Sequence, residues 1–109
     1  MAINVSTLAS QMLGAALPIL KTGADDIESF AKVEFTKIAQ TIVSIGEQLV
    51  AGEINQDQAV LLLDMQKHAS RSVLLTVEGL GILTVEEAIN AALDVVKAAV
   101  NTGLGIALL

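Results

Sequence analysis

The 109-residue chain contains no Cys, no Trp and no Tyr. Without Cys it can form no disulfide, thiol nucleophile or zinc finger, and this composition favours a reducing compartment such as the cytoplasm. Tight recognition of a different protein commonly uses Trp, Tyr and Arg as anchor residues, and the chain holds a single Arg, Arg71. The missing anchors favour extended packing of helix on helix over a few strong contacts.

Basic residues are also scarce, since six Lys and Arg stand against twelve Asp and Glu and the net charge is −6. The six are scattered along the chain, whereas binding to phosphates needs clustered cations that release counterions. We therefore expect no nucleic-acid partner and no attraction to anionic membranes. The first 20 residues carry no charge and lack the basic start of a signal peptide, which also favours a cytoplasmic location.

Hydrophobic residues, mostly aliphatic, make up 53% of the chain, and eight Gly add to them. Ordinary soluble domains reach about 45–50% with Gly included, and a domain of this length buries only about two-thirds of its unfolded surface. We interpret residues 1–109 as one helical domain. Its excess apolar surface is expected to meet a second copy, another helical protein or a lipid surface.

Hydrophobic spacing predicts an all-α, elongated antiparallel four-helix bundle, with helices at about 5–19, 26–51, 56–80 and 85–102, assembled as an oligomer. Pro18 should kink or end the first helix. The apolar residues of the third helix cover about half of its circumference, so this helix is expected at the centre of the bundle.

Local signals predict where these helices begin and end. Capping boxes pair a polar residue with Glu or Gln three positions later, and Gly commonly follows the last residue of a helix. The sequence Gly79-Leu80-Gly81-Ile82, repeated as Gly103-Leu104-Gly105-Ile106, lacks the third Gly and the preceding strand of a dinucleotide loop, so it is interpreted as helix termination. The predicted caps are Asp25 with Glu28, Asn55 with Gln58 and Thr84 with Glu87, and the predicted ends are Gly52 and Gly103.

Two apolar faces are the candidate oligomer or packing face. One is a narrow Ile-rich stripe on the second helix, and the other is a ridge of small residues on the fourth, where helix backbones can approach closely. Either face can be internal core of one chain or a seam between two copies. The residues are Ile38, Ile42, Ile45 and Leu49 in the second helix, and Ala88, Ala92, Val96 and Ala99 in the fourth.

Polar candidates for chemistry are few. Asp64 and His68 have the i, i+4 spacing of two metal ligands, but di-metal bundles need several Glu residues and repeated Glu-x-x-His motifs, so a solvated polar face is the favoured interpretation. Glu34 lies near the apolar stripe of the second helix, where a carboxylate could be buried for function, although pairing with Lys37 is favoured. We predict no catalytic residue, metal or cofactor.

These observations predict a non-enzymatic structural, assembly or protein-interaction protein that forms a helical homo-oligomer. The alternative is a small membrane-active or membrane-associated helical protein that uses the uncharged residues 2–20 or the apolar residues 104–109. Small helical phage proteins have this general character, although no motif identifies such a family. Charges interrupt the other helices, so no span is expected there.

Overall fold

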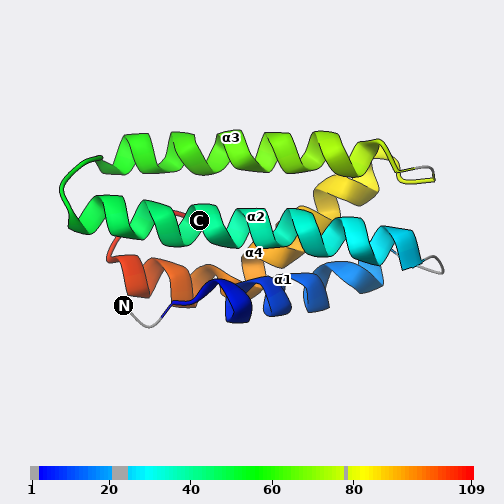
Figure 1. Ribbon diagram of the computed structural model, residues 1–109, viewed down its shortest axis with the longest axis horizontal. Coiled ribbons are helices and arrows are strands. Elements are labelled where there is room, and N and C mark those ends of the chain that lie inside the picture. Colours follow the sequence, from blue (N-terminus) through cyan, green and yellow to red (C-terminus); the bar gives the residue numbers. More distant parts are fainter. Residues whose placement is uncertain (1–2, 21–24, 78) are drawn as a thin grey trace.

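The computed structural model describes residues 3–20, 25–77 and 79–109. Within these ranges the chain forms four α-helices and no strand, which confirms the predicted all-α bundle. Figure 1 shows the four helices along the length of the molecule. They are α1 (Val5–Leu20), α2 (Asp25–Val50), α3 (Gln56–Leu75) and α4 (Ile82–Leu104).

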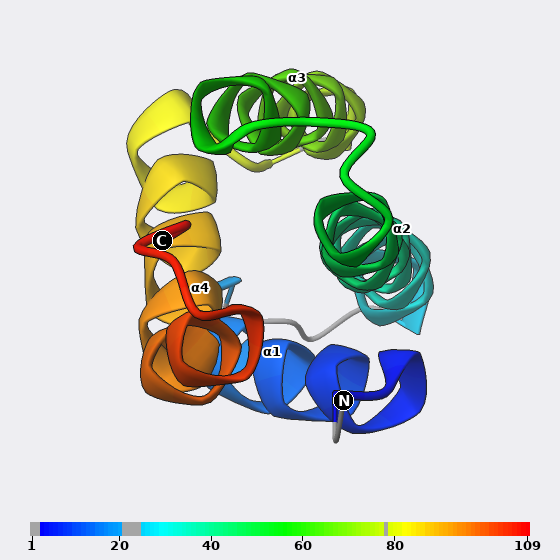
Figure 2. The same ribbon diagram turned by 90° about the vertical axis from the view of Figure 1, so that its left-hand side faces the viewer.

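The helices form a ring when the molecule is seen from its end, in the order α1, α2, α3 and α4 (Figure 2). α2 and α3 run antiparallel and side by side, and α1 packs on both α2 and α4, whereas α3 packs mainly on α2. α4 runs obliquely to the other helices: it begins beside the end of α3 and finishes beside the start of α1 (Figures 1 and 2). The molecule is 43 Å long and 22 by 17 Å across, as the predicted elongated shape requires.

The core lies inside this ring and receives side chains from all four helices. The total accessible surface is 5996 Å², close to the roughly 5700 Å² expected for a compact protein of this mass. The single chain is therefore compact. Any excess of apolar residues must appear as apolar side chains on its surface. The largest fully enclosed apolar side chains are Phe35, Met12, Ile38, Ile42, Ile45, Leu74, Val85, Val96 and Val100.

The end of α2 is set by Gly52, as predicted. Gly52 adopts the left-handed conformation with φ 72°, which Gly reaches without a steric cost. Its N–H donates to the carbonyl of Leu49 (3.1 Å), and the N–H of Glu53 donates to that of Gln48 (2.9 Å). These two bonds are the Schellman pattern, and they satisfy carbonyls that the last turn of α2 would otherwise leave unpaired.

The start of α3 is fixed by the predicted capping box. Asn55 Oδ1 accepts from the backbone N–H of Gln58, and Gln58 Oε1 accepts from the backbone N–H of Asn55, both at 2.9 Å. Two backbone donors of the first turn are thereby satisfied within four residues. Together with Gly52, this short connection turns α3 back along α2.

The predicted boundary between the third and fourth helices is wrong. α3 ends at Leu75 rather than near residue 80, and α4 begins at Ile82 rather than 85. Gly81 is the N-cap, and its carbonyl already accepts the first helical bond, from the N–H of Val85 at 3.0 Å. Thr84 therefore has helical backbone and cannot act as a cap with Glu87. Gly is a tolerated N-cap without a side chain, so the helix extends one turn past the stronger sequence signal.

The predicted stop at Gly103 is also wrong, since α4 continues to Leu104 and ends at Gly105 with φ 72°. Gly103 has a different role, because it gives room to Ile3. A Cβ built on Gly103 would lie 2.5 Å from Ile3 Cδ1, closer than two carbon atoms can pack. The missing side chain therefore allows the segment before α1 to lie directly on α4.

α1 runs through Pro18 and ends two residues later at Leu20. Pro18 lies in the last turn, so few helical bonds follow it. The side chain of Asp25, the predicted cap of α2, is outside the part of the chain that the structure describes, and so are Ala2 and Glu78.

α3 is peripheral, contrary to the expectation that it occupies the centre. It contributes four residues to the buried set, Ala59, Leu63, Ser70 and Leu74, although about half of its circumference is apolar. The oblique path of α4 explains this, because α4 crosses from α3 to α1 and leaves α3 with one close neighbour, α2. Much of the apolar side of α3 therefore remains on the surface.

Candidate functional site

The eight residues of the candidate oligomer or packing face lie mostly inside the single chain. The side chains in α2 at Ile38, Ile42 and Ile45 are buried, and Leu49 is half-buried. In α4 the ridge is divided, since Ala92 is buried and Ala99 is exposed. Ala88 and Val96 are buried with Ala92. These buried residues pack within one bundle and offer no exposed surface to a second copy.

The charged side chains of α3 gather on the side that faces α4. Arg71 Nη1 pairs with Glu86 Oε1 of α4 at 2.7 Å, and Lys67 Nζ lies 3.9 Å from Asp64 Oδ1. Lys67 and Arg71 line a small cleft between the two helices, of about 190 Å³, together with His68 and Glu86. Two ion pairs thus join charges on this side of α3, although Arg71 Nε is buried without a hydrogen-bond partner among the described residues. The opposite side of α3 is left without charge.

That opposite side is an exposed, uncharged stripe along α3. Its members follow steps of four and three residues, which place them on one face of a helix. Met65 at its middle is 59% exposed, and Leu61, which lies between the stripe and the charged side of α3, is also 59% exposed. The stripe consists of Gln58, Leu62, Met65, Ala69, Ser72 and Thr76, of which Leu62 is half-buried and the others are exposed.

α2 continues this surface across the groove between the two helices. The hydroxyl of Thr41 donates to Gln66 Oε1 at 3.4 Å, which shows that the borders of α2 and α3 meet here. A groove of about 300 Å³ runs between them, lined by side chains with amide or hydroxyl ends such as Gln40 and Ser44. Phe30 and Val33 lie nearer the start of α2 and are 47% and 52% exposed.

We name this surface the α2–α3 face: Phe30, Val33, Lys37, Gln40, Thr41, Ser44 and Gln48 of α2, with Leu61 and the α3 stripe. Lys37 is the charged residue among these, and its Nζ pairs with Glu34 Oε2 at 3.2 Å. Folded protein surfaces are typically about 25–35% charged, and the cores of interfaces are depleted in charge. The face therefore shares a low content of charge with the cores of interfaces.

Glu34 is buried and also makes the predicted pair with Lys37. The residue is 2% exposed, and its carboxylate meets the half-exposed Lys37. Glu34 and Ser70 are the buried polar residues of the described chain, and Ser70 Oγ accepts from Gln66 Nε2 at 3.0 Å. These polar contacts follow the α2–α3 boundary, whereas the Ile stripe of α2 faces the interior.

The predicted polar candidates do not assemble into a catalytic or metal centre. His68 is exposed, and Asp64 is nearest to Lys67 rather than to a second ligand. Among the residues that the structure describes, no three His, Asp or Glu side chains converge on a point that could hold a metal ion. Among the described residues, no other helix adds a metal-binding side chain to Asp64 and His68.

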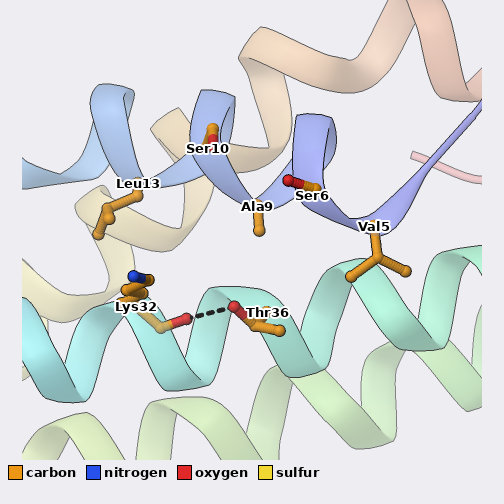
Figure 3. A pocket seen from close by; sticks show the side chains of 7 residues that line it. All are labelled: Val5, Ser6, Ala9, Ser10, Leu13, Lys32 and Thr36. Carbon is orange, nitrogen blue, oxygen red and sulfur yellow. Dashed lines mark hydrogen bonds between the residues drawn. The ribbon is translucent and has the colours of Figure 1, made fainter.

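A second groove, of about 370 Å³, lies between α1 and α2 (Figure 3). Val5, Ala9 and Leu13 point from α1 toward Lys32 and Thr36 of α2 (Figure 3). The Thr36 hydroxyl already donates to the carbonyl of Lys32 at 2.7 Å. Lys32 is the one ionisable side chain that lines this groove, so it offers no acid–base pair.

The uncharged ends of the chain are packed into the bundle. α1 buries Leu8, Met12, Ala16 and Leu20, and Leu108 after α4 is also buried. None of the helices in the described ranges is long and apolar enough to cross a membrane.

Comparison of the chain with models of protein families, with curated protein sequences and with solved structures finds no match in any of the three.

The α2–α3 face was not predicted as a surface, although Leu62, Met65 and Ala69 belong to the apolar half of the third helix. Two features of the sequence could have indicated this surface. One face of the third helix carries no charge from Gln58 to Thr76, and the chain has more apolar residues than a small core needs.

Proposed function

We propose that the protein is a non-enzymatic structural or interaction protein that assembles as a homo-oligomer through the α2–α3 face. One observation carries the proposal: a face two helices wide has no net charge once Lys37 is paired with Glu34, in a chain of net charge −6. An uncharged surface on an acidic protein is the place where close approach to another molecule costs least desolvation and least repulsion.

A second copy fits this face better than an unrelated partner does. Two copies of a chain with net charge −6 repel each other, and the α2–α3 face is where they can meet with least repulsion. Apart from Lys37, its polar groups are amides and hydroxyls, such as Gln40, Ser44 and Gln58, each of which both donates and accepts. A twofold interface brings identical groups together, and such groups can pair with their own kind whereas charges cannot.

The expected strength follows from the four large apolar residues of the face that are exposed, Phe30, Val33, Leu61 and Met65. Complete burial of such a side chain gains about 1.5–3 kcal/mol, so a half-exposed one has about 1 kcal/mol still to gain. Two copies then gain roughly 8 kcal/mol, comparable with the roughly 4–15 kcal/mol that association costs in lost freedom. At the low end of that cost about 4 kcal/mol remains, which corresponds to a dissociation constant of about 1 mM. We therefore expect a weak, reversible dimer that forms only at high protein concentration.

The test compares Met65→Glu with Val95→Glu by size exclusion with light scattering over a concentration series. Val95 lies on α4, is 54% exposed and is absent from the face, so the control adds the same charge to a similarly exposed position. We expect the wild type and Val95→Glu to dimerise alike and Met65→Glu to dimerise at least tenfold more weakly. Circular dichroism should show unchanged helicity in all three.

Three results would contradict the proposal. The wild type would remain a monomer at high concentration, or the two variants would weaken association equally. The third is flotation of the wild type with neutral liposomes, which would favour the membrane-associated alternative instead.

A further inference from the structure

The segment that follows α4 folds back into the opening between α3 and α4. α4 ends at Gly105, which has φ 72°, and residues 106–109, here called the tail, then turn toward α3 (Figure 2). α3 and α4 diverge and contact each other sparsely, so the tail fills a space that the helices do not close. Leu108 is 6% exposed and belongs to the core.

The tail is held by its backbone as well as by Leu108. Asn101 Oδ1 accepts from the N–H groups of both Leu108 and Leu109, each at 3.0 Å. Leu63 of α3 and Leu93 of α4 line the cleft that the tail borders, together with the charged residues Asp64, Lys67, Asp94 and Lys97 at its rim. The Asn101 side-chain oxygen thus binds two consecutive backbone amides, and the Leu108 side chain enters the core beside them. Such an arrangement can bind an extended apolar segment through its backbone.

The remainder of the tail is less deeply buried than Leu108, although Ile106 and Leu109 also pack against the core. Ala107 is exposed, and Ile106 and Leu109 are half-buried. A Cβ built on Gly105 would meet no atom within 4 Å, so the hinge of the tail stands in open space. Release of the tail requires a change at Gly105, loss of the Asn101 bonds and withdrawal of one leucine side chain.

We propose that the α3–α4 groove is a binding site for a short extended apolar segment, and that the tail of a second copy is its partner in trans. The occupant is chosen because the same four residues are seen seated in the groove of their own chain, so their chemistry fits it. Exchange of an identical element between copies is a low-cost route to a dimer. This contact is separate from the α2–α3 face and does not depend on it.

The test uses the full chain with Leu108→Asp, whose tail can no longer enter the core. An acetylated, fluorescently labelled peptide with the sequence of residues 105–109 is titrated against it and read by anisotropy. We expect saturable binding to Leu108→Asp, with binding to the wild type at least tenfold weaker because its own tail competes. Adding Asn101→Ala to Leu108→Asp should weaken binding at least fivefold, since the two amides lose their acceptor.

A peptide in which the residue matching Leu108 is Asp serves as the control and should not bind. The inference is overturned if the peptide does not bind to a helical Leu108→Asp chain, or if Asn101→Ala leaves its affinity unchanged. If Leu108→Asp does not fold, the milder variant Leu108→Ala is used, and it should bind the peptide more tightly than the wild type because its own tail is held less firmly while Asn101 is kept. Equal or weaker binding there would also overturn the inference. Dimerisation through the α2–α3 face, measured with Met65→Glu, can succeed or fail independently of either result.

Discussion

The helix caps offer the sharpest test of how this chain encodes its fold, because sequence and structure disagree about one of them. Asn55 is a cap in both, and its Oδ1 accepts from the N–H of Gln58 at 2.9 Å. Asn55→Ala removes this bond but keeps the backbone N–H that donates to the Gln58 side chain. Loss of such a cap costs about 1 kcal/mol, and replacement by Gly costs only a few tenths. We therefore expect the order wild type, Asn55→Gly, Asn55→Ala in decreasing stability.

Thr84→Ala should behave differently, although Thr84 carries the stronger sequence signal. Thr84 lies within the first turn of α4, which begins at Ile82 after the N-cap Gly81. Ala is a better helix former than Thr by roughly 0.5 kcal/mol, which offsets the lost contacts of a half-buried side chain. We expect a stability within about 0.5 kcal/mol of the wild type.

Thermal and urea denaturation followed by circular dichroism at 222 nm would measure both variants. A loss of 1 kcal/mol should lower the Tm of a protein of this size by roughly 4 °C, whereas Thr84→Ala should leave it nearly unchanged. Equal losses for Asn55→Ala and Thr84→Ala would refute the reasoning, because Thr84 would then be acting as a cap. Protein concentration must be matched, since dimerisation would raise the apparent stability.

Three further substitutions test the interior. Ala92→Glu should abolish cooperative folding, seen as loss of the 222 nm signal, because Ala92 is completely enclosed and an unpaired buried charge costs several kcal/mol; a folded monomer would show that the ridge is accessible. In a chain that also carries Ile3→Ala, Gly103→Ala should raise the free energy of unfolding by about 1 kcal/mol through helix propensity. Beside the native Ile3 the gain should be smaller. A double-mutant cycle of urea midpoints would measure the difference. Additive effects would show that the two residues do not touch. Glu34→Met should raise the free energy of unfolding by about 1 kcal/mol, because a buried carboxylate loses hydration that the half-exposed Lys37 replaces only in part; a large loss of stability would assign the pair a structural role.

Some residues of this chain determine their structure through neighbours a few positions away. The Asn55 box closes between residues three apart, and Gly52 sets the end of α2 through bonds within five residues. Such short-range interactions are readable from sequence, as is the apolar period that predicts each helix. The Ile stripe of α2 was likewise recognisable as a packing face, though its partner was not.

The partner of each face depended on contacts between segments that are distant in sequence. The sequence showed that half of the third helix is apolar, but the oblique path of α4 decided that Met65 and Ala69 would stay outside while Leu63 and Leu74 went inside. The same packing let Gly81 rather than Thr84 begin α4, and it left the gap into which Leu108 folds. Sequence alone determined which stretches are helical and how the turn between α2 and α3 forms, because those bonds are local. Tertiary structure decided which apolar side was covered, because burial depends on where the other helices lie.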